Sequence, residues 1–176
     1  MNQGLGDLER VGDVWQVRYT RTLGHPPEKV WRSLTEPEHL RAWFPTDIEG
    51  DWSLGAKLRF VFRENEGPDF DGEVLAYDPP HLLEFRWGDE VLHFELQPTG
   101  DGTALTFVVT LEEIGKAARD GAGWHQCLEL LDYELNGETP PPDAKASWKA
   151  LFELYQERFG PEASTIGPPE GMVYDA

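Results

Sequence analysis

The chain has 176 residues, of which 39% are hydrophobic, and its 33 acidic and 15 basic side chains give a formal net charge of −18. This length is typical of one domain that buries enough apolar surface to fold without disulfides or metals. The negative charge repels phosphate groups, which argues against nucleic acid and membranes as partners. Seven tryptophans and nine phenylalanines are an excess of large rings, some of which we expect to line a binding space.

Targeting signals and disulfides are not expected. The single cysteine, Cys127, cannot pair within the chain, and its place on an apolar helix stripe indicates a small core residue. The N-terminus has no basic region followed by an apolar run, and no apolar stretch approaches the roughly 20 residues of a membrane span. We therefore expect a soluble, cytoplasmic protein.

The first elements in chain order are a strand and two short helices. Alternation and β-branched residues predict a strand over residues 14–22. Pro27 then opens a short helix, because proline is favoured in a first turn. The sequence Thr35-Glu36-Pro37-Glu38 predicts a capping box that starts a second short helix, and Pro45 ends it.

From residue 57 the hydrophobic period changes from 3.6 to 2, which indicates strands. The predicted strands cover residues 57–63, 72–77, 82–87, 91–97 and 103–112. Short turns such as Gly88-Asp89 join them, so we expect an antiparallel meander with one apolar and one solvated face.

The longest amphipathic helix is predicted over residues 123–136, where Trp124, Leu128 and Leu131 recur on one stripe. About 14 helical residues span about 20 Å, which matches the length of one strand. This helix is therefore expected to cover the apolar face of the meander.

One domain is expected over residues 13–160, with a core over 14–137. A proline-rich spacer leads from this core to an extra C-terminal helix, predicted over 144–159. Residues 1–12 are predicted to be a flexible lead-in, and residues 161–176 a poorly ordered tail.

Several segments together resemble a known family. Pro27 to Trp31, Leu34 to Leu40 and Trp43-Phe44 resemble the signature of activator of heat-shock protein 90 ATPase homologues, which are members of the START-like (SRPBCC) superfamily. Gly72 to Leu75 and Gly123-Trp124 follow in the order that this family shows. The likeness spans most of the predicted core.

The resemblance implies an α+β helix-grip fold, in which a curved antiparallel sheet wraps around the long helix and two short helices follow the first strand. It also implies a hydrophobic cavity between the sheet and that helix. The residues expected to contact a small hydrophobic ligand there are Trp43, Phe44, Phe60, Phe62, Phe85, Trp87, Phe94, Phe107, Trp124, His125 and Leu128. Each ring alone is more typical of plain core packing, whereas the set together favours a pocket.

Motifs for chemistry are scarce. The sequence has no Gly-x-Ser-x-Gly elbow, no Walker-type loop and no dinucleotide fingerprint, and its five histidines lack metal-ligand spacing. We therefore expect no catalytic residue, no cofactor and no metal. His125 is interpreted either as a polar contact for the ligand or as a surface residue at the helix start, and His93 is expected to be solvated.

Three functions stay open at this point. A module that binds a small hydrophobic ligand is favoured, because at most one polar residue, His125, can be assigned to the cavity. The first alternative is an enzyme similar to polyketide cyclases or hydratases that acts on the bound ligand. The second is a co-chaperone-like modulator of the heat-shock protein 90 ATPase, with the chaperone as partner and the acidic surface as its docking face.

Overall fold

The computed structural model describes residues 4–63, 67–144 and 148–167. Its strands are β1 (Asp7–Val11), β2 (Val14–Leu23), β3 (Thr46–Glu49), β4 (Lys57–Phe62), β5 (Phe70–Asp78), β6 (Leu82–Trp87), β7 (Glu90–Thr99) and β8 (Gly102–Leu111). Its α-helices are α1 (Pro27–Thr35), α2 (Pro37–Trp43), α3 (Ala117–Leu135) and α4 (Trp148–Phe159), with short 3-10 helices η2 (Ile114–Lys116) and η4 (Pro161–Ser164).

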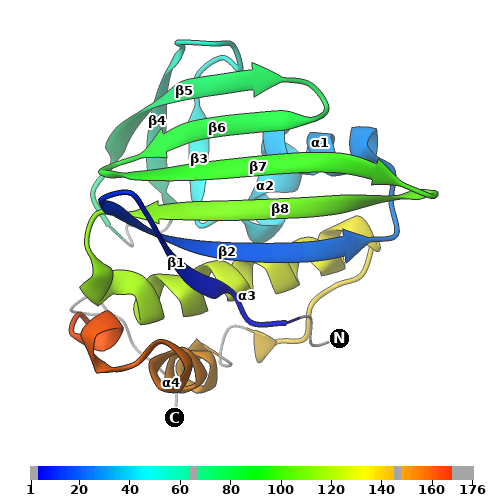
Figure 1. Cartoon of the computed structure of the whole chain (residues 1–176). Coiled ribbons are helices and arrows are strands. Elements are labelled where there is room, and N and C mark those ends of the chain that lie inside the picture. The colour runs from blue at the N-terminus through cyan, green and yellow to red at the C-terminus, as the bar shows by residue number, and fades with distance from the viewer. Residues whose placement is uncertain (1–3, 64–66, 145–147, 168–176) are drawn as a thin grey trace.

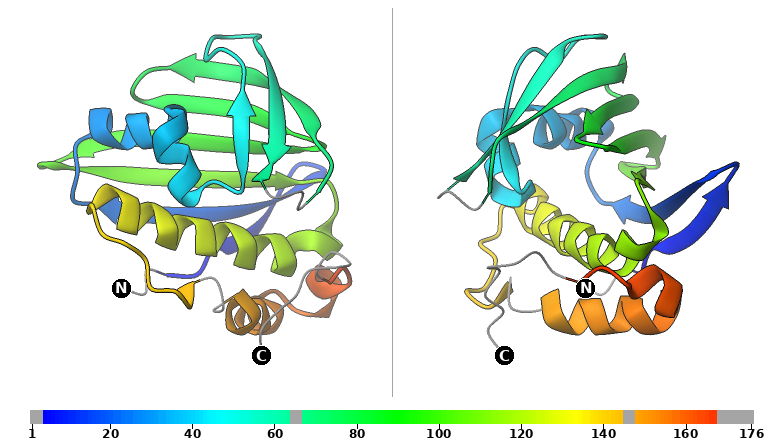
Figure 2. Two further views of the ribbon diagram at one scale, coloured as in Figure 1. Left: turned by 180° about the vertical axis from the view of Figure 1, so that it is seen from behind. Right: turned by 90° about the vertical axis from the view of Figure 1, so that its left-hand side faces the viewer.

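The strands form one antiparallel eight-stranded sheet in the order β1-β2-β8-β7-β6-β5-β4-β3. This sheet curls around α3, and α1 and α2 lie beside α3 on the same concave side (Figures 1 and 2). A register shift between Val74 and Ala76 interrupts the pairing of β5 with β6, and such irregularities bend a sheet. The expected α+β helix-grip fold is confirmed.

Alternation along the strands decides which side chains enter the core. Phe85, Phe94 and Phe107 occupy inward positions of β6, β7 and β8, and each is at most 1% exposed. Gly88 has a φ of 60°, which suits the two-residue turn that joins β6 to β7. The meander therefore has the predicted apolar face, and α3 covers it with Trp124 and Leu128.

The predicted lead-in over residues 1–12 is wrong for part of its length. Asp7–Val11 form β1, which pairs antiparallel with β2, so that Asp7 lies opposite Arg18. This strand lies at the edge of the sheet and most of its side chains stay accessible. Its sequence therefore lacks the apolar alternation that marks a strand with one buried face.

The long helix begins six residues before its predicted start, at Ala117, so Gly121 and Gly123 lie inside it. Packing explains the first of these glycines. A Cβ at Gly121 would lie 3.1 Å from the ring of Tyr155 in α4, so glycine allows α4 to approach α3 closely.

The capping box predicted at Thr35 is also wrong. The Thr35 hydroxyl donates to the Trp31 carbonyl oxygen at 2.9 Å within α1, and Glu36 precedes α2 without a side-chain cap. The short strand β3 was not predicted either, although it pairs with β4 along its whole length. Its four residues are too few to show a clear period.

The predicted disordered tail is wrong for its first residues. Pro161–Ser164 form η4, Ala163 is fully buried, and the Ile166 amide donates to the Gly115 carbonyl oxygen at 3.1 Å. Residues 168–176 of the predicted tail and residues 145–147 of the predicted last helix lie outside the described residues. Among the helices in the described ranges, none has the length and apolarity to cross a membrane.

A buried hydrogen-bond network joins α4 to α3, β2 and the N-terminal segment. The Tyr155 hydroxyl accepts from the Gly6 amide at 2.8 Å and lies 2.8 Å from His125 Nδ1. The Tyr19 hydroxyl donates to the Gly121 carbonyl oxygen at 2.5 Å. Burial raises the pKa of both tyrosines, so both hydroxyls stay protonated and the network holds α4 against the domain.

Removing the hydroxyl of Tyr155 tests this network. Tyr155→Phe is expected to lower the free energy of unfolding by about 1–3 kcal/mol, because it leaves the buried Gly6 amide and His125 ring without this partner. Urea denaturation measures the change, and Tyr133→Phe, at a half-buried position of α3, is the control. If Tyr155→Phe unfolds with the free energy of the wild type, the network does not stabilise the fold.

Candidate functional site

Three rings from three separate elements meet in the concave interior. Phe44 directly follows α2, Trp87 ends β6, and Trp124 lies on α3. The ring centroids are 5.2 Å apart for Phe44 and Trp87, 5.6 Å for Phe44 and Trp124, and 5.5 Å for Trp87 and Trp124. We call these three residues the aromatic junction.

A row of phenylalanines extends from the aromatic junction along the concave face of the sheet. Phe94 and Phe107 stack with centroids 4.4 Å apart, and Phe85 stacks against Phe94 at 6.1 Å. Phe60 continues the row, stacked at 6.0 Å from Phe85. Most residues predicted to contact a ligand therefore come together: Trp43, Phe44, Phe60, Phe85, Trp87, Phe94, Phe107, Trp124 and Leu128.

Two predicted contact residues lie elsewhere. Phe62 is half-buried at the far rim, where its ring contacts Phe70 at 5.9 Å. His125 faces α4, because its ring contacts are with Tyr19 and Tyr155 and its Nε2 lies 3.3 Å from a carboxylate oxygen of Glu129. The interpretation of His125 as a surface residue is wrong, since it is 2% exposed. The early start of α3 places this residue inside the helix.

Two further rings, which the sequence did not indicate, belong to the cluster. Trp52 packs 5.5 Å from Phe85, and its indole nitrogen donates to the Thr35 carbonyl oxygen at 2.8 Å. Phe70 packs 4.7 Å from Trp87. Both rings come from segments outside the predicted helices and strands, where the only sequence signal for them is a large ring among polar residues.

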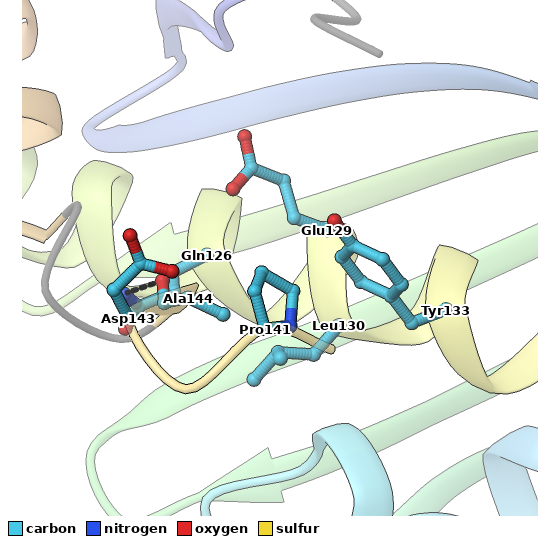
Figure 3. A pocket seen from close by; sticks show the side chains of 7 residues that line it. All are labelled: Gln126, Glu129, Leu130, Tyr133, Pro141, Asp143 and Ala144. Atoms are coloured by element: carbon cyan, nitrogen blue, oxygen red, sulfur yellow. Dashed lines mark hydrogen bonds between the residues drawn. The ribbon is translucent and has the colours of Figure 1, made fainter. Parts of the chain in front are cut away.

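Two hollows lie outside the ring cluster. The larger, of about 240 Å³, lies between α3 and the segment that follows it, and is lined by Gln126, Glu129, Leu130, Tyr133, Pro141, Asp143 and Ala144 (Figure 3). The second, of about 190 Å³, lies between α2 and β3. No residue predicted to contact the ligand lines either hollow. Between sheet and α3 the rings contact one another, so the ligand cavity stays a prediction.

A pair of carboxyl groups, Glu90 and Asp120, lies beside the aromatic junction and was not predicted. Glu90 is 8% exposed at the first position of β7, and the Asp120 side chain is 12% exposed in the first turn of α3. Burial, and then the charge and hydrogen bond of Asp120, raise the pKa of Glu90 from 4.5 to about 8. At neutral pH the pair therefore holds a proton.

The remaining contacts of the pair are few. Glu90 Oε2 accepts from the Glu112 amide at 3.3 Å, and Asp120 Oδ1 accepts from Arg119 Nε at 3.0 Å. Asp120 Oδ2 is buried and, within the part of the chain that the structure describes, no N–H donor reaches it. A signal for Glu90 does exist in the sequence, since it occupies an inward position two residues before Leu92, where the pattern calls for an apolar residue.

One surface group has the composition of a metal site. Ligand atoms of Glu36, Glu38 and His39 lie within 4.8 Å of one another, and His39 Nδ1 lies 2.5 Å from a carboxylate oxygen of Glu134. The group is partly exposed, and exposed acidic groups of this kind are common without an ion. The expectation of no metal stays a prediction.

The carboxyl pair predicts a pH dependence of stability. Between pH 4.5 and about 8 the folded protein keeps a proton on Glu90 that the unfolded chain loses, so this contribution is full at low pH and is lost as the pH rises to about 8. Glu90→Gln keeps a hydrogen-bond donor for Asp120. We expect this variant to lose the dependence of the unfolding free energy on pH between 4.5 and about 8, and to have a higher unfolding free energy than the wild type at alkaline pH.

Urea unfolding at a series of pH values measures this effect. Glu73→Gln, at a partly exposed position paired with Lys57, is the control and should keep the slope of the wild type. Equal slopes for Glu90→Gln and the wild type would contradict a shared proton.

Several solved protein structures are similar to this chain. EF2215 of Enterococcus faecalis, a conserved protein of unknown function, has a TM-score of 0.73 at 22% identity, over 87% of this chain and 89% of that one. CalU16 of Micromonospora echinospora has a TM-score of 0.69 at 21% identity, over 88% and 96%. MLL2253 of Mesorhizobium loti has a TM-score of 0.61 at 29% identity, over 71% and 99%. These structures are similar in fold.

No curated protein matches the sequence. The profile of the family described as activator of Hsp90 ATPase homolog 1-like protein matches residues 24–136, from the turn before α1 to the end of α3. Because this match covers more than half of the chain, the protein belongs to the family of activator of Hsp90 ATPase homolog 1-like proteins, within the START-like (SRPBCC) superfamily.

Proposed function

We propose that the protein binds a small, ring-containing apolar molecule at the aromatic junction, between the sheet and α3. The observation that carries the proposal is the meeting of Phe44, Trp87 and Trp124 from three separate elements. Ring contacts of this kind contribute only about 0.5–1.5 kcal/mol each beyond burial. A flat ligand that takes the place of the Phe44 ring keeps the two tryptophans in aromatic contact.

Phe44 is the ring of the three that lies outside the helices and strands, and its backbone is held by hydrogen bonds from its amide to the Leu40 carbonyl oxygen at 2.8 Å and from Arg63 Nη1 to its own carbonyl oxygen at 3.0 Å. It lies in the link between α2 and β3, with extended backbone angles of −82° and 142°. The strand that follows it, β3, is the edge strand of the sheet and pairs only with β4. A hollow of about 190 Å³ lies beside this link, lined by residues of α2 and β3. We expect a ligand that displaces the Phe44 ring to shift this link and to leave the central strands in place.

The alternatives have weaker support. An enzyme of the polyketide-cyclase type needs a polar group aimed at the ligand. His125, the residue assigned to that role, faces α4, so this alternative would depend on the carboxyl pair of Glu90 and Asp120 instead. A role on the heat-shock protein 90 chaperone is supported by the name of the family and by the net charge of −18. Retention of the protein on that chaperone at low salt, and its loss with added salt, would favour the second alternative.

Phe44→Ala is the most direct variant for this proposal. It removes a ring that is 1% exposed, so we expect a loss of about 3–5 kcal/mol in the free energy of unfolding. It also opens space at the aromatic junction, so indole should bind at least about tenfold more tightly than to the wild type, because it no longer displaces Phe44. Calorimetric titration with indole measures both affinities, and added indole should restore part of the stability.

The matched control is Phe152→Ala. Phe152 stacks on Trp148 in α4, outside the concave interior, so its loss should leave the affinity for indole unchanged. Binding by Phe44→Ala alone, with none by the wild type, would show an engineered cavity and count against the proposal. So would equal effects of the two substitutions.

A further inference from the structure

Thr46, the first residue of β3, carries a buried hydroxyl group without a hydrogen-bond partner. Its side chain is fully buried, and within the residues that the structure describes no donor or acceptor bonds to its Oγ1 atom. In the unfolded chain this hydroxyl group bonds to water, so its burial without a partner costs free energy. A ligand that supplies the missing partner recovers this cost.

Strand pairing places the Thr46 hydroxyl group on the concave side of the sheet. Thr46 lies directly opposite Phe62 of β4, and directly opposite residues of an antiparallel pair share one face of the sheet. Alternation puts Phe62 on the same face as Phe60, whose ring centroid lies 4.8 Å from that of Trp87 in the aromatic junction. The Thr46 side chain therefore points into the interior that holds the ring cluster.

Arg63 holds Thr46 and Phe44 side by side. Its Nη1 atom donates to the Phe44 carbonyl oxygen at 3.0 Å, and its Nη2 atom donates to the Thr46 carbonyl oxygen at 2.9 Å. Its Nε atom donates to a carboxylate oxygen of Asp47 at 2.9 Å, so each nitrogen of the guanidinium group has an acceptor. The polar group that this link offers to a ligand is therefore the neutral hydroxyl group of Thr46.

The surroundings of this hydroxyl group select a neutral partner. The neighbouring rings of Phe44, Phe60 and Phe62 are apolar, and a charge placed among them would lose its hydration without an opposite charge to pair with. A hydroxyl group on the ligand is neutral and can both donate to Thr46 Oγ1 and accept from it. A ring without a polar group would leave Thr46 unpartnered.

We infer that Thr46 determines specificity at the aromatic junction, and that the ligand is a neutral ring compound with a hydroxyl group, of the phenol class. Its ring takes the place of the Phe44 ring against Trp87 and Trp124, and its hydroxyl group bonds to Thr46 Oγ1. This inference rests on the proposed function and names the ligand class together with the residue that selects it.

The compounds p-cresol and p-xylene test the inference, because they share one ring and differ only in a hydroxyl group in place of a methyl group. Thr46→Val makes the same exchange in the protein. The ratio of p-cresol affinity to p-xylene affinity should fall at least about fivefold in this variant, because p-cresol then buries its hydroxyl group without a partner. Thr46→Ser retains the hydroxyl group and should keep the ratio of the wild type. Calorimetric titration measures all of these affinities.

The matched control is Thr103→Val. Thr103 is also a fully buried threonine near the start of a strand, but its hydroxyl group donates to the His25 carbonyl oxygen at 2.7 Å. Thr103→Val should lower the urea midpoint and leave the affinity ratio unchanged, whereas Thr46→Val should unfold at a urea midpoint equal to or above that of the wild type. A lower midpoint for Thr46→Val would overturn the inference, because it would show that the hydroxyl group already has a partner in the folded protein.

The outcomes distinguish this inference from the proposed function. If both compounds bind the wild type and Thr46→Val has the same affinity ratio, the role of Thr46 is refuted and the binding of ring compounds stands. An equal fall of the ratio in Thr46→Val and Thr103→Val also refutes it. If neither compound binds the wild type, the proposed function fails, and the inference that rests on it fails too.

Discussion

The contact of Trp124 with the concave face of the sheet is the interaction on which the rest of the structure depends. Its ring packs against Phe44, Trp87 and Phe107, which come from the α2–β3 link, β6 and β8. One side chain therefore ties the helix to two central strands of the sheet and to the link that follows α2. The same contact concentrates the rings at one place, so stability and the proposed binding site share the same residues.

The outer side of α3 is fixed by a different kind of interaction. There the helix meets α4 through buried hydrogen bonds of Tyr19, His125 and Tyr155, and Gly121 lets the two helices approach. The apolar side of α3 tolerates exchange of one ring for another, because dispersion and burial are not directional. The hydrogen-bonded side does not, since each lost partner leaves a buried polar group. A ligand that enters on the apolar side therefore leaves the docking of α4 intact.

The central elements could be predicted from the sequence because local patterns specify them. Strand β6 has the predicted bounds, since Pro79-Pro80 and Gly88 enclose a clear alternation, and most of the predicted rings do gather on the concave face. Features that depend on tertiary contacts could not be predicted. Gly121 alone indicates the end of a helix, and its role in the close packing of α4 on α3 is evident only from the structure. Glu90 and Asp120 are 30 positions apart in sequence, so only the fold shows that they form a pair. The edge strands β1 and β3 were missed because their side chains are not alternately buried.

The most direct measurement of the central claim is a titration of the wild-type protein with indole, followed by NMR of the indole N–H signals of its seven tryptophans. Each signal is assigned by a Trp→Phe variant. If the ligand enters the aromatic junction, the signals of Trp87 and Trp124 move with one common dissociation constant, while that of Trp148, which stacks on Phe152 in α4, stays in place. Movement of the Trp148 signal alone, or of no signal at saturating indole, would contradict the account.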